Sequence, residues 1–427
     1  MCPFIIILTR KVMKKSLIGP AFIMIAGISG ILTSCDKTKD NTLPGDPVPI
    51  ELTLKQKEVV DSANKFAFDL FVPIITEKQG AENIMISPFS ITSALSMTLN
   101  GAAGETFEAM KSGLRYDSET IEEINDTYLK LMKDMVPVDS RVVLEIANSV
   151  WVDKKLTVKQ TFMTALETYY LAEARNIDVL DPGAVDEVNG WISDKTHDKI
   201  QKMLESLDPD IAMLLINAVY FNGKWRYQFD KDNTLDRPFY VTPGAPVEVP
   251  MMYQKEKFAV TETGNATLIE LPYGQGNYSM VVMLPDEGVS TAEAAAGLSS
   301  TKWAQWMQDL SYGTTEVELS LPKFKYEYKR ELNDDLKNLG MEIAFDPYNA
   351  DFSNISDQDL YISFVLHQTF IDTNEEGTEA AAATIVGISV TSVPMTMVIN
   401  VNRPFLYFIR ETTTGTIVFM GQVADPR

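Results

Sequence analysis

Few side chains in this 427-residue chain could act as nucleophiles, general bases or metal ligands. Histidine occurs only at His197 and His367, and cysteine occurs only at Cys2 and Cys35. A serine hydrolase needs a histidine base, and the sequence carries no His-Glu-x-x-His, no Gly-x-Ser-x-Gly and no phosphate-binding loop. His197 lies in a polar stretch and is expected to be exposed. His367 lies in an apolar run and is expected to be a buried, hydrogen-bonded residue. We therefore expect a protein that is not an enzyme and that uses no metal and no cofactor.

The most informative segment runs from residue 375 to residue 394 and suits a conformational change better than catalysis. Its alanine run favours helix, whereas the β-branched run that follows favours strand. In a strand, alternate residues from Thr378 to Thr384 would share one small, nearly apolar face, and the charge of Glu379 would lie on the other face. Gly377 would give the backbone freedom where such a strand begins to turn. The segment is equally suited to be a loop or a central strand, so the chain could store folding energy and release it when cut.

Cys35 follows a pattern that is typical of an export signal. Basic residues between positions 10 and 15 precede a mostly apolar run from 17 to 32, which is short for a membrane span and suits a signal-peptide core. Leu-Thr-Ser directly before Cys35 resembles a bacterial lipoprotein signal, in which the cysteine is lipidated and becomes the first mature residue. The alternative is an ordinary secretory signal with a chance cysteine.

This pattern predicts three parts of the chain. Residues 1–34 would be a lipoprotein signal peptide, and Met13 is an alternative start that would make residues 1–12 a misassigned extension. Residues 35–51 would be the lipidated cysteine and a proline-rich tether. Residues 52–427 would form one domain, because no second linker or repeat interrupts them. We expect a secreted, extracellular lipoprotein whose lipid is its only membrane anchor, in the bacterial cell envelope, at the outer membrane or the cell surface.

The elements that must position these residues change character along the chain. Helical spacing of apolar residues, or capping by Ser87-Pro88 and Asn100-Gly101, predicts helices near residues 59–70, 88–100, 118–135 and 159–173. Strands are predicted at 280–284, 317–321, 364–371, 405–409 and 416–420. Helices crowd the first half without regular strand–helix alternation, which favours an α+β fold with large, partly antiparallel sheets. The net charge of −22 argues against binding of nucleic acid or anionic membranes through charge.

Residues 375–384 resemble the hinge of the serpins, the serine protease inhibitor superfamily. Seven further motifs match that family in the same order, at residues 83–91, 217–225, 249–252, 284–287, 321–323, 402–405 and 419–421. Together they cover roughly residues 55–427. The resemblance implies the serpin fold, a single domain with three β-sheets, eight to nine helices and an exposed reactive-centre loop.

The same resemblance assigns site residues one by one. The hinge residues would be Glu375, Glu376, Gly377, Thr378, Glu379, Ala380, Ala381, Ala382, Ala383 and Thr384. The shutter, where strands of the main sheet part for the loop, would contain Ser87, Ser90, Asn217 and His367. The breach, where insertion starts, would contain Trp225, Lys323 and Glu375. We predict a Lys323–Glu375 ion pair there, and the alternative is two unpaired surface charges.

As the resemblance implies, the protein would be a suicide-substrate inhibitor of a serine protease. The protease would cut the reactive loop, the cut loop would insert into the main sheet, and the covalent acyl-enzyme would be trapped. Counting seventeen residues from Glu375 predicts the reactive bond at Thr391-Ser392, with Val390-Thr391 and Met395-Thr396 as alternatives.

The residues of the loop also indicate its targets. No lysine or arginine lies between Thr378 and Asn402, so elastase-like or subtilisin-like proteases fit better than trypsin-like ones, and papain-like cysteine proteases are a further option. We expect a monomer without a heparin-type cofactor. The alternatives are a non-inhibitory serpin that acts as a binding or carrier protein and, least favoured, a surface lipoprotein with an unrelated binding role.

Overall fold

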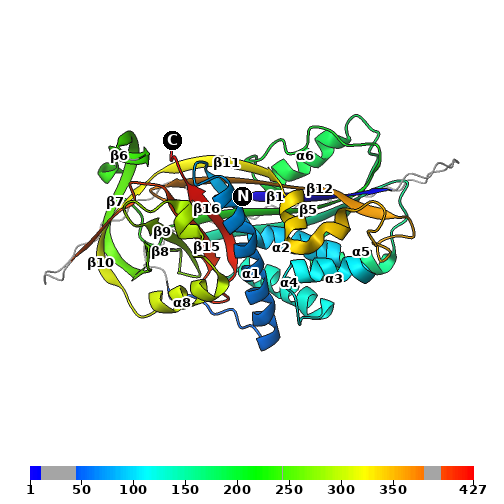
Figure 1. Ribbon diagram of the computed structural model, residues 1–427, viewed down its shortest axis with the longest axis horizontal. Helices are drawn as coiled ribbons and strands as arrows, with labels where there is room; N and C mark the ends of the chain where they lie inside the picture. Colours follow the sequence, from blue (N-terminus) through cyan, green and yellow to red (C-terminus); the bar gives the residue numbers. More distant parts are fainter. Residues whose placement is uncertain (11–44, 243, 379–395) are drawn as a thin grey trace, which may run out of the picture.

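The computed structural model describes residues 1–10, 45–242, 244–378 and 396–427 (Figure 1). The helices within these ranges are α1 (Leu54–Glu77), α2 (Pro88–Leu99), α3 (Gly104–Gly113), α4 (Ile121–Met135), α5 (Gln160–Tyr169), α6 (Ala184–Lys195), α7 (Thr291–Ala295), α8 (Ser300–Leu310) and α9 (Asn333–Leu336). In this part of the chain, no helix is both long and apolar enough to cross a membrane.

The main sheet brings together strands from both ends of the chain. Its strands are β1 (Cys2–Arg10), β3 (Val142–Asp153), β4 (Glu173–Ile177), β5 (Ile211–Lys224), β11 (Phe324–Glu331), β12 (Leu360–Asn374) and β13 (Gly377–Thr378). Across the sheet the order is β11, β12, then β1 and β13, then β5, β3 and β4. Only β3 and β4 pair in parallel; the other pairs are antiparallel.

The remaining nine strands form two further sheets that share one long strand. They are β2 (Ile84–Ile86), β6 (Leu235–Thr242), β7 (Ala245–Glu262), β8 (Ala266–Tyr273), β9 (Tyr278–Pro285), β10 (Thr315–Pro322), β14 (Met397–Asn400), β15 (Phe405–Glu411) and β16 (Ile417–Val423). The first part of β7 pairs with β6 and β10, and its last four residues pair with β8. The predicted α+β class is confirmed. Because the pairing partners change along β7, the nine strands count as two sheets and the described residues form three sheets in all.

Helices cover both faces of the main sheet, so its inner strands are buried on both sides. In Figure 1, α6 lies above the main sheet and α2 lies below it, and both helices contact β5. Residues of β5 alternate between the two cores: Leu214 and Ile216 pack with α6, whereas Met213 and Leu215 join the larger core that contains α2. This alternation follows from the period of two in a strand.

The predicted helices and strands match the observed ones with small shifts at their ends, except that α1 extends well beyond the predicted 59–70 on both sides. Ser87 caps α2 by accepting a hydrogen bond from the Ser90 N–H, and Pro88 occupies the first turn, where a missing N–H costs nothing. Residues 274–277 form the turn between β8 and β9. Strand β1 was not expected, because residues 1–12 were interpreted as part of a leader or as a misassigned extension.

Candidate functional site

The predicted site residues gather along one seam of the main sheet, between β12 and β5. We call this seam the slot. The short strand β13 fills the end of the slot at the breach, and β1 fills the rest. Figure 1 shows β1, β5 and β12 lying side by side in the sheet. The breach and the shutter therefore lie at two levels of the same slot.

At the breach, the predicted ion pair is present. The Lys323 Nζ lies 3.0 Å from Oε2 of Glu375 and 3.2 Å from Oε1, and the Thr234 hydroxyl donates to Oε1 at 2.9 Å. The side chain of Glu375 is only 7% exposed, whereas that of Lys323 is 38% exposed. Burial raises the pKa of Glu375, but its backbone N–H, Lys323 and Thr234 favour the charged form by more, so the pKa lies below its usual value.

A second ion pair anchors the neighbouring carboxylate, and the sequence analysis missed it. The Lys231 Nζ lies 2.6 Å from Oε1 of Glu376, whose side chain is 7% exposed. Lys231 follows Trp225 by six residues in a turn before β6, and only the fold brings it beside the hinge. Two lysines from distant segments therefore hold two consecutive carboxylates at the start of the hinge.

Trp225 ties the hinge to the sheet through its ring and its backbone. Its indole N–H donates to the Asn374 carbonyl at 2.9 Å, and its backbone N–H donates to the Glu376 carbonyl at 2.9 Å. The indole stacks on Tyr273 with ring centroids 4.4 Å apart and planes 9° from parallel. The Tyr273 hydroxyl in turn lies 2.7 Å from Oγ1 of Thr378, so one aromatic pair connects the breach to the first inserted side chain.

Gly377 is required where the hinge enters the sheet. It has a φ of +155° and pairs with both Asn374 and Lys224. A Cβ on this residue would lie 2.0 Å from the Gly223 carbonyl oxygen, closer than atoms can approach. Only glycine lets the two backbones meet at this distance.

The four predicted shutter residues meet beneath the slot and are all buried. The Ser87 N–H donates to Nε2 of His367 at 3.0 Å, and the Ser87 hydroxyl donates to the Val418 carbonyl at 2.7 Å. The Ser90 hydroxyl donates to Oδ1 of Asn217. The shutter residues thus connect α2 to β12, β5 and β16.

The hydrogen bonds of Asn217 continue beyond the predicted shutter. Its amide donates at 2.7 Å to Oδ1 of Asn148, whose own amide donates at 2.7 Å to the Tyr170 carbonyl. Sequence reasoning missed Asn148 on β3, although a buried asparagine opposite Asn217 is what an extended amide network requires. The network therefore joins β5, which borders the slot, to its neighbour β3.

His367 makes a second contact, with a residue of β1. Because Nε2 accepts the Ser87 N–H, the neutral ring carries its proton on Nδ1, which lies 3.3 Å from Sγ of Cys2. Burial, together with the charge of the Met1 amino group, lowers the pKa of His367 to about 3. Burial raises the pKa of Cys2 to about 12. Both groups are therefore neutral at pH 7.

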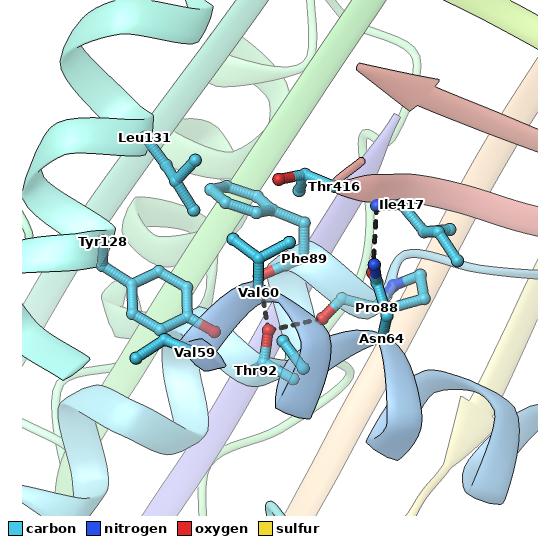
Figure 2. Close-up of a pocket in the computed structure, with 11 residues that line it drawn as sticks. Val59, Val60, Asn64, Pro88, Phe89, Thr92, Tyr128, Leu131, Thr416 and Ile417 are labelled. Carbon is cyan, nitrogen blue, oxygen red and sulfur yellow. Dashed lines mark hydrogen bonds between the residues drawn. The ribbon is translucent and has the colours of Figure 1, made fainter. Parts of the chain in front are cut away.

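The cavity closest to the start of α2 is too small for an organic ligand. Figure 2 shows it between Val59 and Val60 of α1, Tyr128 and Leu131 of α4, and Ile417 of β16. Its volume of about 10 Å³ is roughly the space of one water molecule. The start of α2 therefore packs closely against α1, α4 and β16.

His197, the other histidine, lies away from the slot. As predicted it is exposed, and its Nε2 lies 2.9 Å from Oε2 of Glu145. Several predicted positions lie outside the described residues, namely Cys35, the hinge from Glu379 to Thr384, and Val390, Thr391, Ser392 and Met395. Among the described residues, no three His, Cys, Asp or Glu side chains are arranged to hold a metal ion.

Comparisons with known proteins agree with this geometry. The family model described as serpin (serine protease inhibitor) matches residues 61–426. The human leukocyte elastase inhibitor is 35% identical over 382 residues, which are 86% of this chain and the whole of the relative.

Solved structures with a TM-score of 0.78 to this chain include those of two proteins with contrasting names. The thermophilic serpin tengpin in its native state is 35% identical, with 90% of this chain and 97% of tengpin covered. Human thyroxine-binding globulin is 27% identical, with 87% of this chain and 99% of the globulin covered.

Proposed function

Because the chain belongs to the serpin family, we propose that it inhibits serine proteases as a suicide substrate. The protease attacks the reactive loop after residue 378, and its catalytic serine forms an ester with the carbonyl of the residue before the cut. The loop then inserts between β12 and β5 as a new strand. The protease, still attached, is carried across the sheet before water can release it.

The observation that carries this proposal is the partial entry of the hinge into the slot. Gly377 and Thr378 pair with both β12 and β5, and Thr378 is 4% exposed. A cut loop would need no new point of entry, because its first two residues are already in the sheet. With residues 1–34 removed, full insertion would satisfy the backbone groups of β12 and β5 that pair with β1 in the full chain. This gain is the driving force that trapping requires.

The side chains of the loop support the same conclusion. Thr378 points toward Tyr273, so alternate residues that follow it in a strand would face the same packed core. At positions 380, 382 and 384 these residues are alanine, alanine and threonine. Small side chains can enter such a core without a clash, whereas a charge or a proline could not.

We propose elastase-like or subtilisin-like proteases as targets, with Thr391-Ser392 as the reactive bond. A small β-branched residue before the bond fits a shallow apolar pocket, and the relative that inhibits leukocyte elastase is consistent with this choice. We further propose that residues 1–34 are removed and that lipid on Cys35 anchors the protein in a bacterial cell envelope. The covalent complex would then form at the membrane surface.

The second candidate is a non-inhibitory binding protein. The similarity to thyroxine-binding globulin favours it, but the small-residue hinge argues against it. After cleavage a non-inhibitory member would release the protease and leave no covalent complex.

The test uses residues 36–427, which lack the leader and the lipidated cysteine. The protein is mixed in turn with pancreatic elastase, subtilisin and trypsin, and the products are resolved on denaturing gels and by mass spectrometry. We expect a covalent complex with elastase or subtilisin and a released C-terminal peptide that begins near Ser392. Cleavage without a complex, and without a rise in melting temperature, would refute inhibition.

A further inference from the structure

Strand β1 occupies the part of the slot that β13 does not fill. It pairs antiparallel with β12 from Phe4 to Arg10 and with β5 from Cys2 to Thr9, so it lies between two neighbours rather than at an edge. Residues 2–9 are all buried. The N-terminal segment is therefore a central strand of the main sheet.

The side chains of β1 match the two cores that the slot joins. Phe4, Ile6 and Leu8 point into the core that contains α2, whereas Ile5 and Ile7 point into the core that contains α6. All five are 0% exposed. A run that is apolar on both faces is what a strand covered by helices on both sides requires. The slot thus selects a continuous apolar segment.

Polar groups at the two ends fix the position of this segment. The Met1 amino group donates to the Phe370 carbonyl at 2.7 Å. At the other end the Arg10 guanidinium donates to Oδ1 of Asp153 at 2.9 Å, and the Asp153 side chain is 0% exposed. The positive charge at each end of β1 therefore has a partner. A shift of β1 by one residue along the slot would lose both contacts and would turn each side chain of β1 toward the opposite core.

The two segments that share the slot almost meet. Thr378 lies opposite Thr373 of β12, and Met1 bonds to Phe370. Only Ile371 and Asp372 of β12 lie between these positions. The cavity between Thr378 and Met1 has a volume of about 10 Å³. No more than about two further loop residues could enter the slot before they reached Met1, since a strand advances roughly 3.3 Å per residue.

We propose that Met1–Arg10 is a built-in ligand of the slot, which binds in place of the reactive loop and excludes it. The inference rests on the proposed function, because the competitor is the inserting loop. A strand continued from Thr378 in the same register would bring Ala381 opposite Phe370, where Met1 lies, and Thr384 opposite His367, where Phe4 lies. The same backbone groups of β12 and β5 cannot pair with both segments. Loss of residues 1–34 would vacate the slot and permit trapping.

Cys2 is a direct reporter of this binding. It is 0% exposed, its thiol lies against His367, and Cys35 is the only other cysteine in the chain. The test uses the full chain with Cys35→Ala, made by cell-free synthesis so that residues 1–34 stay attached. The rate at which a thiol reagent modifies Cys2 is measured before and after elastase cuts the loop.

We expect Cys2 to react at least about 100-fold more slowly than in the unfolded chain, both before and after cleavage, because buried thiols react only when the strand opens. Rapid reaction before cleavage would overturn the proposed binding. Protection before cleavage followed by rapid reaction after it would overturn the exclusion, because it would mean that the loop displaces β1.

A matched pair of full-chain variants controls the measurement. Ile6→Asp places a charge in the core between the helix layers and should release β1, so that Cys2 reacts at the rate of an exposed thiol. Ile6→Val keeps an apolar β-branched side chain and should leave Cys2 protected. A far-ultraviolet circular dichroism spectrum and a melting curve establish that Ile6→Asp remains folded, and protected Cys2 in folded Ile6→Asp would also overturn the proposed binding.

The outcome is separable from that of the proposed function. If residues 36–427 trap no protease, the proposed function fails, but Cys2 still reports whether β1 occupies the slot. If residues 36–427 trap elastase and the full chain with protected Cys2 traps it equally well, the exclusion is wrong while the proposed function stands.

Discussion

Thr378→Arg should convert the proposed inhibitor into a substrate of its target protease. Thr378 is 4% exposed, and its hydroxyl lies 2.7 Å from that of Tyr273 between β12 and β5. Arginine there would carry a guanidinium into the packed core of the main sheet. The carboxylate of Asp372 lines the neighbouring cavity, but it already pairs with Lys325 at 3.2 Å. The new charge would therefore lack a free partner at this position.

The size of the effect follows from the cost of that burial. In the uncut variant the hinge can leave the slot and keep the guanidinium in water, whereas insertion must bury it. An uncompensated buried charge costs about 3–5 kcal/mol. If about 3 kcal/mol of this cost is present in the transition state for insertion, insertion slows roughly 150-fold. Trapping depends on insertion that is faster than hydrolysis of the ester, so a delay of this size should release most of the protease.

The assay measures how many molecules of residues 36–427 are consumed for each elastase molecule inactivated, together with the cleaved and complexed bands on a denaturing gel. We expect the ratio to rise by more than about tenfold for Thr378→Arg. Thr168→Arg is the matched control, because Thr168 is exposed on α5 and the same charge remains in water. Unchanged trapping by Thr378→Arg would refute the insertion of this side chain.

Three further predictions concern the breach, the shutter and the anchor. Lys323→Ala and Glu375→Gln should each lower the free energy of unfolding by about 1 kcal/mol at pH 7, a modest effect because Lys323 is partly exposed. A double-mutant cycle should give a coupling energy of about 0.5–1 kcal/mol between the two residues. Strictly additive effects would contradict the ion pair. Because folding lowers the pKa of Glu375, its carboxylate stabilises the folded state fully above the pKa of about 4.3 that it has in the unfolded chain. This contribution to the free energy of unfolding is lost as the pH falls through the pKa of Glu375 in the folded protein. In the full chain, the pKa of His367 is lowered to about 3, so the unfolded state binds one more proton below pH 6.5. Stability should then fall by up to about 1.4 kcal/mol per pH unit between pH 6.5 and 5. His367→Gln should remove that component of the slope in chemical denaturation, and an identical slope would show that His367 is not the group involved. Cys35→Ala should move the protein from the membrane fraction to the soluble fraction of a fractionated bacterial host, and continued sedimentation with membranes would exclude the lipid anchor.

Much of the site could be predicted because it depends on local sequence. Ser87-Pro88 is both a helix start and part of the shutter, so the capping pattern places Ser87 at the end of α2, next to β12. The Lys323–Glu375 pair was predicted from the resemblance and is present. The other anchors depend on tertiary contacts. Nothing in the spacing of Lys231 and Glu376, 145 positions apart, indicates that their side chains meet.

Strand β1 could not be predicted for a physical reason. A strand that is buried on both faces has no polar–apolar alternation, so Phe4–Leu8 cannot be distinguished by period from the apolar part of an export signal. Its partners, His367 on β12 and Asn217 on β5, lie hundreds of positions away in the sequence. The distinguishing feature is the slot itself, which sequence reasoning assigned to the cut loop alone.

The strand that fills the slot also indicates how the main sheet could store energy when β1 is absent. With β1 absent, the facing edges of β12 and β5 below Thr378 would expose backbone groups or would have to close directly on each other, and sheet edges of this kind recruit any strand that fits. The hinge enters for two residues because Trp225, Tyr273 and Gly377 form its entrance. Whichever segment completes the sheet satisfies both edges and fills both cores. A sheet that is most stable when its slot is full would supply the driving force for the proposed loop insertion, and under the proposed exclusion that driving force would be available to the loop only when β1 is absent.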